Sequence, residues 1–394
     1  MKLLIINDAG ITGGGTENRV RMLVDELLKQ KIFEEIHLLT KFSQQPHPVI
    51  FVHQCKYNES PFLHTLKIIR KHKINIVQMH NSSVLWPTPI LAAKLLRKPV
   101  LFFAHDYWPI CGRRSFIKAE TASKEMLCEK TQIKKCAKCI GIKSTLKLKL
   151  WKSIINLANV GISASHFLKN IYENEKVLRN KWQIVLPWID INKFKTVKNN
   201  TLPKKENIIL FVSSLIEFKG AWVAAKALKY IIQKVPDAKL AFIGDLQEPE
   251  SRYRQDIENI CKQDKTIGNV TFLGRQNWDS IKEWHLKSKV FIFPTVCMES
   301  FGLVWAEAMV SGVPIVASAV GSIPELISDK GILVPPLDEI ALANAIINGL
   351  TNPKLANDLS SAGKTYALKT FNIKTAADSL IKIYKTIAIF EKNV

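Results

Sequence analysis

Short apolar runs recur along the chain, and each is followed by a polar or glycine-containing break and then by an amphipathic segment. The first run, Leu3–Ile6, precedes Arg19–Leu28, in which the apolar residues fall on one helical face. Further strand-like runs follow at Ile36–Leu39, Val49–Val52, Ile74–Met79, Pro99–Ala104, Leu157–Ser163 and Ile184–Leu186. Strands that alternate with helices are typical of a parallel sheet covered by helices, so the pattern predicts an α/β fold.

A polar segment, 195–206, separates this alternation from a second one. The segment has no apolar period, which is typical of a linker. Beyond it, the stretch Ile373–Phe390 has the pattern of an amphipathic helix. The strand-like runs of this second part are Ile208–Val212, Lys239–Ile243, Val270–Leu273 and Val290–Phe293. We therefore expect an N-terminal domain over 1–195, a C-terminal domain over 206–370 and a terminal helical segment over 371–394.

The composition is that of an ordinary globular protein, since 47% of the 394 residues are hydrophobic and 23% are charged. No apolar run approaches the roughly 18 residues that a membrane-spanning helix needs. The apolar run near the start is also too short for the core of a signal peptide. We expect a cytoplasmic protein, either free or peripheral on the inner face of the membrane.

The formal net charge is +22, because 56 Lys and Arg side chains outnumber 34 Asp and Glu side chains. An excess of this size favours a polyanionic partner, such as nucleic acid or an anionic membrane surface. The alternative is a lysine-rich surface that serves solubility alone. The sequence contains no recognisable nucleic-acid-binding motif, so nucleic acid is not an expected partner.

Part of the basic excess lies in Arg113–Lys152, which has only three acidic residues and which we interpret as an insertion at about 110–150. Four cysteines in this region end in a C-x-x-C pair, an arrangement seen in structural zinc sites. Their spacing differs from that of a standard zinc finger, so free thiols remain the alternative. These cysteines are Cys111, Cys128, Cys136 and Cys139.

Within the insertion, Lys143–Lys152 places Leu146, Leu148, Leu150 and Trp151 among four lysines. Leucine and tryptophan among basic residues are typical of a segment that lies in a membrane interface. The strict alternation from Leu146 to Leu150 is not the spacing of an amphipathic helix. The basic charge nevertheless predicts salt-sensitive, peripheral binding to anionic lipid.

The most informative stretch is 290–327, which predicts a buried strand, a loop, a helix and another strand. Glu299 lies in the loop at the carboxyl end of the first strand, and Glu307 lies in the second turn of the helix. A helix N-terminus presents free N–H groups to phosphate, and carboxylates accept hydrogen bonds from sugar hydroxyls. A nucleotide sugar has both kinds of group. The alternative is a helix cap at Glu299 and a solvated carboxylate at Glu307.

The stretch PT…ESFGLVWAEAMVSGVPIVAS…GSIPELI resembles the E-x7-E signature of the group 1 glycosyltransferases, a large retaining family with the GT-B fold. The resemblance implies two Rossmann-like domains that face each other across a cleft, with a C-terminal helix that crosses back to the first domain. It implies that Glu299 contacts hydroxyls of the donor sugar and that Glu307 holds the ribose. Backbone N–H groups of Phe301, Gly302 and Leu303 would then meet the diphosphate and the sugar.

Two segments of the N-terminal domain also resemble the family. Gly14 and Gly15, in the loop after the first strand, correspond to a loop that borders the donor phosphates. His105, at the carboxyl end of a strand, corresponds to a histidine that faces the donor sugar. Asp106 follows it and would either orient the histidine or belong to the acceptor side.

A further match lies after the first strand of the C-terminal domain. Lys219 corresponds to a family lysine that contacts the donor diphosphate. Ser214 stands where the family has an arginine, and a hydroxyl carries neither the charge nor the fork of a guanidinium. Arg275 is the candidate cation that would replace it.

The resemblance implies a retaining, metal-independent glycosyltransferase of the hexosyltransferase type, with His105, Lys219 and Glu299 as catalytic residues. The C-terminal domain would bind a nucleotide sugar of the UDP or GDP type, and the N-terminal domain a glycan or lipid-linked acceptor. No cofactor is required, and the expected role is in cell-surface polysaccharide or glycolipid assembly. Two alternatives stay open: a non-catalytic glycosyltransferase-like partner subunit, suggested by Ser214, and a polyanion-binding protein.

Overall fold

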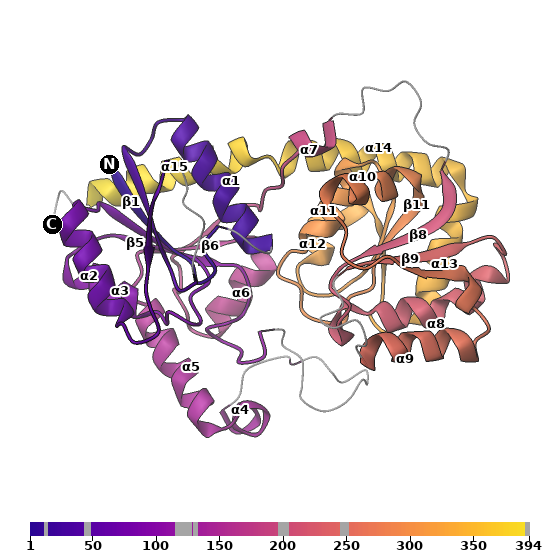
Figure 1. Cartoon of the computed structure of the whole chain (residues 1–394), viewed down its shortest axis with the longest axis horizontal. Helices are drawn as coiled ribbons and strands as arrows, with labels where there is room; N and C mark the ends of the chain where they lie inside the picture. The colour runs from indigo at the N-terminus through magenta and orange to yellow at the C-terminus, as the bar shows by residue number, and fades with distance from the viewer. Residues whose placement is uncertain are drawn as a thin grey trace. The chain divides into compact units, whose positions relative to one another are not determined.

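The computed structural model describes residues 1–11, 15–42, 49–114, 128, 133–195, 205–244 and 252–390. The chain forms two compact units (Figure 1). The first unit comprises Met1–Trp188 together with Ile373–Val394, and the second unit comprises Ile189–Asn372. Each unit contains a parallel sheet with helices packed against it, so the predicted α/β fold is confirmed.

Among the described residues, the sheet of the first unit has seven strands in the order β3-β2-β1-β4-β5-β6-β7, and all neighbouring strands are parallel. Its central strands are buried on both faces, which explains why they read as continuous apolar runs. The strands are β1 Lys2–Ile6, β2 Glu35–Thr40, β3 Phe51–Gln54, β4 Ile76–Met79, β5 Val100–Ala104, β6 Val160–Ser163 and β7 Trp182–Ile184.

Helices cover both faces of this sheet (Figure 1). Helices α1 and α15 pack against each other on one face, and α2 and α3 pack against each other on the opposite face. The helices of the unit are α1 Gly15–Lys29, α2 Pro61–His72, α3 Thr88–Leu95, α4 Ile133–Ile140, α5 Ile142–Ile155, α6 His166–Asn174 and α15 Ile373–Phe390.

Helix α15 is held in the first unit by an apolar face whose residues recur at helical spacing. Leu380 and Tyr384 are fully buried in a core cluster that also contains Leu23 and Leu27 of α1. The ring of Tyr384 meets Phe33 edge-on, with the ring centroids 5.2 Å apart. Because burial of one such side chain contributes about 1.5–3 kcal/mol, α15 is an integral part of this core.

Among the described residues, the sheet of the second unit has six parallel strands in the order β10-β9-β8-β11-β12-β13. The strands are β8 Glu206–Val212, β9 Lys239–Ile243, β10 Val270–Phe272, β11 Ser288–Phe293, β12 Ile315–Ser318 and β13 Ile332–Val334. The helices are α7 Asn192–Lys195, η1 Glu217–Lys219, α8 Ala221–Ile232, α9 Arg252–Gln263, η2 Ile267–Asn269, α10 Trp278–Lys287, α11 Leu303–Val310, α12 Ile323–Ile327, η3 Ser328–Lys330, α13 Glu339–Thr351 and α14 Pro353–Thr370.

The strand order reverses once in each sheet, between β1 and β4 in the first unit and between β8 and β11 in the second. Loops leave the carboxyl ends of the two strands in opposite directions at such a point and open a crevice between them. The reversal points therefore indicate where each unit is built to hold a ligand.

The segment from Leu146 to Leu150 lies in the helix α5, Ile142–Ile155, although its strict alternation is not the spacing of an amphipathic helix. Leu148 and Trp151 are buried, whereas Leu146 and Leu150 are more than half exposed. The buried Leu148 lies between the exposed Leu146 and Leu150 in the sequence, so a buried and an exposed apolar face of the same helix together produce the alternation. In the described part of the chain, no helix has both the length and the apolar character needed to cross a bilayer.

Candidate functional site

The loops that follow β8 and β11 bring two charged side chains together at the strand-order reversal of the second unit. Lys219 lies at the end of η1, and Glu299 lies in the loop between β11 and α11. Their Nζ and Oε1 atoms form a hydrogen-bonded ion pair. These residues are 80 positions apart in the sequence, so the sheet is what makes them neighbours.

The carboxylate of Glu299 is buried, with 7% of the residue exposed. Besides Lys219, its Oε1 accepts hydrogen bonds from the Thr295 hydroxyl at 3.2 Å and the Cys297 thiol at 3.4 Å. Burial is the largest influence on the pKa of Lys219 and lowers it, but the charges of Glu299 and Cys297 and the hydrogen bond to Glu299 together outweigh burial, so the net pKa shift is upward. Lys219 is therefore a charged lysinium. The side-chain contacts that described residues make with Glu299 all go to one carboxyl oxygen, Oε1.

Two glycines allow the loops of this site to approach one another closely. Gly220 has φ 76°, and a Cβ there would lie 1.9 Å from the carbonyl oxygen of Pro294. Gly321, after β12, has φ 65°, and a Cβ there would lie 2.5 Å from both the backbone N and O of Glu299. The Ser322 N–H and hydroxyl both donate to the Glu299 carbonyl at 2.9 Å. Any side chain at Gly220 or Gly321 would displace the charged pair.

The helix that follows Glu299 begins with an uncapped N-terminus. Gly302, with φ 87°, precedes α11, and no side chain among the described residues caps the helix there. Gly302 and Leu303 are partly exposed, whereas Phe301 is buried against Trp305 with ring centroids 5.0 Å apart. The first N–H groups of the helix are thus available to a ligand and are aligned with the positive end of the helix dipole.

Glu307 lies one turn further along α11 and is also buried, with 7% of the residue exposed. Burial raises the pKa of its carboxyl to about 8, although the charge of Lys193 on α7 lowers it in part. A carboxyl with this pKa is mostly protonated at neutral pH. The alternative interpretation of Glu307 as a solvated carboxylate is therefore wrong.

Ser214 is exposed in the loop after β8, and Arg275 is exposed in the loop after β10. Gly244 connects these loops: a Cβ there would lie 1.8 Å from the carbonyl oxygen of Ser213, and its N–H donates to the Gly274 carbonyl at 3.0 Å. The loop that carries Arg275 thus packs beside Gly244, which packs beside the loop that carries Ser214. This arrangement places the loops that carry Ser214 and Arg275 on either side of Gly244.

In the first unit, His105 follows β5 and has both ring nitrogens in hydrogen bonds. Its Nδ1 lies 2.7 Å from Nη2 of Arg19, and its Nε2 lies 2.6 Å from Nδ1 of His80. A guanidinium can only donate, so Nδ1 of His105 accepts and Nε2 carries the proton. Burial and the charge of Arg19 lower the pKa of His105 well below its usual value. His105 is therefore a neutral imidazole that Arg19 and His80 orient.

The strand-order reversal of the first sheet lies between β1 and β4, and residues near it were not identified as functional from the sequence patterns. Asp8 follows β1, is buried, and accepts hydrogen bonds from the N–H groups of Val84 and Leu85 at 2.7 and 2.9 Å. His80 follows β4, so the rule that selected His105 at the end of β5 applies equally to it. Arg19 carried no signal, because its role depends on a contact across 86 positions. Gly14 lies outside the described residues, and Gly15 is the first residue of α1.

The structure describes all four cysteines of the insertion, Cys111, Cys128, Cys136 and Cys139. Cys136 and Cys139 lie on α4, and none of the four belongs to the His, Cys, Asp and Glu groups of the described residues whose ligand atoms lie within 4.8 Å of one another. The zinc site expected at Cys111, Cys128, Cys136 and Cys139 stays a prediction.

Comparison with known protein families covers nearly the whole chain. The family described as "Glycosyl transferases group 1" matches residues 192–366, and the family described as "Glycosyltransferase Family 4" matches residues 13–193. The two matches meet where the first unit passes into the second.

Curated relatives are similar over part of their length. The chain is 30% identical over 191 residues to the phosphatidyl-myo-inositol mannosyltransferase of Mycobacterium leprae, covering 47% of this chain and 48% of the relative. It is 29% identical over 249 residues to the N-acetyl-alpha-D-glucosaminyl L-malate synthase of Bacillus anthracis, covering 61% and 62%. The chain thus spans about half to three fifths of the length of these relatives.

Solved structures extend the likeness to the whole fold. HepE from Anabaena, in complex with UDP and glucose, has a TM-score of 0.76 at 18% identity and covers 98% of this chain and 100% of its own. Sucrose-phosphate synthase from Thermosynechococcus elongatus has a TM-score of 0.72 at 20% identity and covers 98% of each chain. From its two parallel sheets and these matches, the chain belongs to the group 1 glycosyltransferases and has their GT-B fold.

Proposed function

We propose that this chain is a retaining glycosyltransferase that moves a sugar from a nucleotide-diphosphate sugar to an acceptor hydroxyl, without a divalent metal. The observation that carries the proposal is the Lys219–Glu299 ion pair at the strand-order reversal of the second sheet, beside the uncapped N-terminus of α11. An ammonium group and helix N–H groups suit a diphosphate, and a carboxylate suits the hydroxyls of a sugar.

Lys219 has three N–H donors, so it can keep its bond to Glu299 and direct another donor to the diphosphate. Negative charge grows on the leaving phosphate as its bond to the sugar breaks. Lys219 and the N–H groups of Gly302 and Leu303 would stabilise that charge in place of a metal ion. Glu299 would accept a hydrogen bond from a sugar hydroxyl through Oε2, since its described partners all bind Oε1.

In the proposed reaction, the acceptor oxygen forms its bond to the anomeric carbon on the same face from which the diphosphate departs. The departing phosphate oxygen takes the acceptor's proton, so no side chain is needed as a covalent nucleophile. This course keeps the configuration of the sugar. Glu307 would hold the ribose hydroxyls of a UDP- or GDP-type donor, and Arg275 would supply the cation that Ser214 lacks.

Purified protein should be screened with a panel of UDP- and GDP-sugars by thermal shift, because a ligand that binds the folded state raises the melting temperature. A donor that raises it should then support release of nucleoside diphosphate when acceptors are added. The configuration of the product, read by NMR, tests retention. Binding of a donor without turnover with any acceptor would instead support the non-catalytic partner subunit.

Glu299→Gln should lower turnover about tenfold to 150-fold, since a hydrogen bond to a charged group contributes about 1.5–3 kcal/mol. The matched control is Glu217→Gln, which removes an exposed carboxylate two residues from Lys219 in η1. We expect the control to keep wild-type turnover. Wild-type turnover in Glu299→Gln would show that Glu299 has only a structural role.

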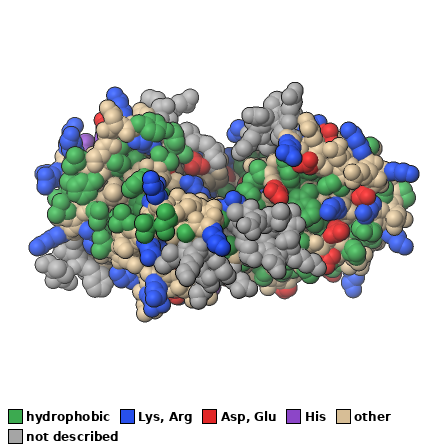
Figure 2. Space-filling view, turned by 90° about the horizontal axis from the view of Figure 1, so that it is seen from below, with side chains coloured by type: hydrophobic (Ala, Val, Ile, Leu, Met, Phe, Trp, Pro, Cys, Tyr) green, Lys and Arg blue, Asp and Glu red, His purple; other side chains and the backbone are tan. Residues whose placement is uncertain are grey.

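For the acceptor, we propose a lipid-linked molecule reached through peripheral binding to an anionic membrane surface. On α5, Ile142, Leu146 and Leu150 are 56%, 55% and 53% exposed at four-residue spacing, so they form one outward stripe. Lys143 and Lys149 lie between them in the sequence. Figure 2 views the molecule from below Figure 1, where hydrophobic side chains lie among Lys and Arg side chains. An apolar stripe with neighbouring lysines suits a membrane interface.

Sedimentation with liposomes tests this acceptor proposal. We expect binding to anionic vesicles that salt weakens, because each Lys near such a surface contributes about 1 kcal/mol. Leu146→Glu with Leu150→Glu should abolish it, whereas Ile340→Glu, which alters a residue 53% exposed in the second unit, should not. Equal binding to neutral and anionic vesicles would contradict the proposal.

A further inference from the structure

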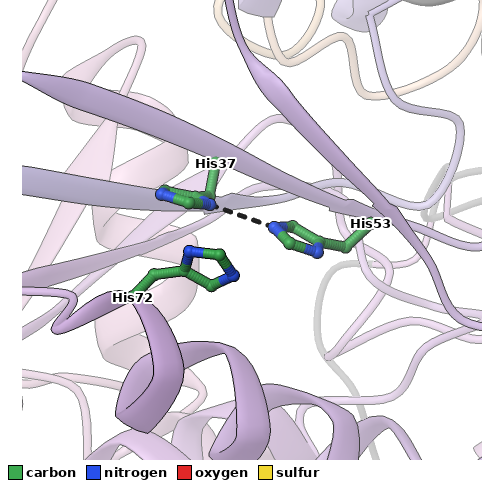
Figure 3. A group of neighbouring side chains, drawn as sticks. All are labelled: His37, His53 and His72. Carbon is green, nitrogen blue, oxygen red and sulfur yellow. Dashed lines mark hydrogen bonds between the residues drawn. The ribbon is translucent and has the colours of Figure 1, made fainter.

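Three histidines meet on the first unit, away from the strand-order reversal. His37 lies on β2, His53 on the edge strand β3, and His72 is the last residue of α2. Each offers a ring nitrogen, and these nitrogens all lie within 4.8 Å of one another. Figure 3 shows the three imidazoles turned toward a common centre. None of them takes part in the proposed glycosyl transfer.

The strand geometry explains why these side chains share one face. Ile36 and Leu38 belong to the core cluster that lies against α1 and α15, so His37 points to the opposite face of the sheet. That face is the one covered by α2, whose last turn carries His72. In the parallel register, Leu39 pairs with His53, which puts His53 on the same side as His37, two positions along.

The spacing of the ring nitrogens is close to that of a metal site. Nδ1 of His37 lies 3.0 Å from Nε2 of His53. In a tetrahedral site with zinc–nitrogen bonds of about 2.0–2.1 Å, neighbouring nitrogens lie about 3.3 Å apart. The ring of His72 lies 4.4 Å from that of His37 and 5.3 Å from that of His53, centroid to centroid. A metal ion therefore needs only small side-chain adjustments.

A carboxylate orients the buried member of this group. Nε2 of His37 lies 3.0 Å from Oε2 of Glu35, and Oε1 of Glu35 accepts from Lys2 at 2.6 Å. Nε2 of His37 thus donates its proton, which leaves the lone pair of Nδ1 directed toward His53. A carboxylate behind a histidine is the usual second shell of a zinc ligand. His53 and His72 are partly exposed, which gives an ion a path from solvent.

We propose that His37, His53 and His72 bind a zinc ion, with a water molecule at the fourth position. Imidazole ligands suit zinc among the available divalent ions, and a three-histidine set leaves one position open. The ion would join β2, the edge strand β3 and the end of α2. Its role is to fix this edge of the first sheet, and it does not depend on the proposed function.

The test uses tag-free, full-length protein that has been stripped with chelator and titrated with Zn²⁺. His53→Gln and His72→Gln each remove a partly exposed ligand, so the fold should survive. We expect each to bind zinc at this site at least about 100-fold more weakly and to lose the zinc-dependent rise in melting temperature. Glu35→Gln keeps an acceptor for His37 and should weaken zinc about 10-fold to 100-fold.

The matched control is His64→Gln, because His64 belongs to a neighbouring group with Cys55 and Glu59. It should keep wild-type zinc affinity. Substitution of Co²⁺ for Zn²⁺ distinguishes this site from a cysteine site. The visible absorption of bound Co²⁺ that disappears in His53→Gln should contain no thiolate charge-transfer band, because the ligands are histidines. Equal zinc content and affinity in wild type, His53→Gln and His72→Gln would overturn the proposal, as would loss of the site in His64→Gln alone.

Discussion

Replacement of Glu307 by glutamine should make the protein more stable at alkaline pH. Burial raises the pKa of Glu307 from 4.5 to about 8, so the folded state holds a proton that the unfolded state releases between these values. The stabilising effect of that proton is fully present below pH 4.5. It is lost as the pH rises and is gone above about pH 8.

The size of the effect follows from the two pKa values. Each pH unit between 4.5 and about 8 lowers the free energy of unfolding by about 1.4 kcal/mol, and the full loss is about 5 kcal/mol. Glutamine has nearly the same shape as protonated glutamate and does not titrate. Glu307→Gln should therefore match wild type near pH 4.5 and exceed it by several kcal/mol above pH 8.

Urea unfolding at pH 5, 6.5 and 8.5 measures the difference in the free energy of unfolding between Glu307→Gln and wild type. The titration of all other groups is common to both proteins and cancels in this difference. Glu283→Gln, at an exposed position on α10, is the control and should show a difference that does not change with pH. A constant difference between Glu307→Gln and wild type across this range would refute the reasoning. It would mean that Glu307 is ionised throughout despite its burial.

The same proton gives a second measurement through the donor. If Glu307 accepts hydrogen bonds from ribose hydroxyls as a carboxylate, nucleotide binding at pH 7 should release about 0.9 proton per site, the fraction that a pKa of about 8 holds. Calorimetry in two buffers of different ionisation enthalpy measures the release. Binding enthalpies that do not depend on the buffer would contradict a ribose role for Glu307.

Three further substitutions test the loops of the second unit. Lys219→Met should weaken binding of the nucleoside diphosphate about tenfold or more and leave binding of the nucleoside unchanged, because the positive charge of Lys219 acts on the phosphates. Equal weakening of nucleoside and nucleoside diphosphate binding would indicate that Lys219 has a packing role. Ser214→Arg should be tolerated at its exposed position and tighten diphosphate binding about tenfold, and loss of binding would show that the loop is built around serine. Gly321→Ala should lower the free energy of unfolding by about 1–3 kcal/mol and impair donor binding, because φ is 65° and the added Cβ meets the backbone of Glu299. Gly268→Ala is the control and should change neither, because its Cβ points into open space. Unfolding and donor-binding measurements on both variants test this prediction.

Several elements could be predicted from the sequence because local signals mark both of their ends. The structure has β9 at Lys239–Ile243 and α15 at Ile373–Phe390, as the apolar patterns predict. Helix α2 begins at Pro61, because the Ser60 hydroxyl accepts from the Leu63 N–H at 3.4 Å and caps the first turn. That capping signal was present in the sequence and was not used.

The candidate site could be predicted in part. Glu299 and Glu307 lie on a loop and on the helix that follows it, so their short separation in the sequence predicts that they lie close together in the structure. The contact of Arg19 with His105 joins helix α1 to the loop after β5, and the contact of Gly321 with Glu299 joins two loops, so no local pattern encodes either contact. The same is true of the zinc site, whose ligands come from two strands and the end of a helix.

The return of α15 to the first unit has a consequence for the order in which the protein folds. Closing a loop as long as Ile189–Asn372 costs about 4–5 kcal/mol of chain entropy if that loop is unstructured. The two ends of the second unit are paired, because Ile189 and Asn372 form a bridge and the Ile189 N–H donates to the Phe371 carbonyl at 3.0 Å. Once the second unit has folded, Trp188 and Ile373 are brought close together, and α15 docks over a very short span. We therefore expect the first unit to complete its core last, after synthesis of the whole chain.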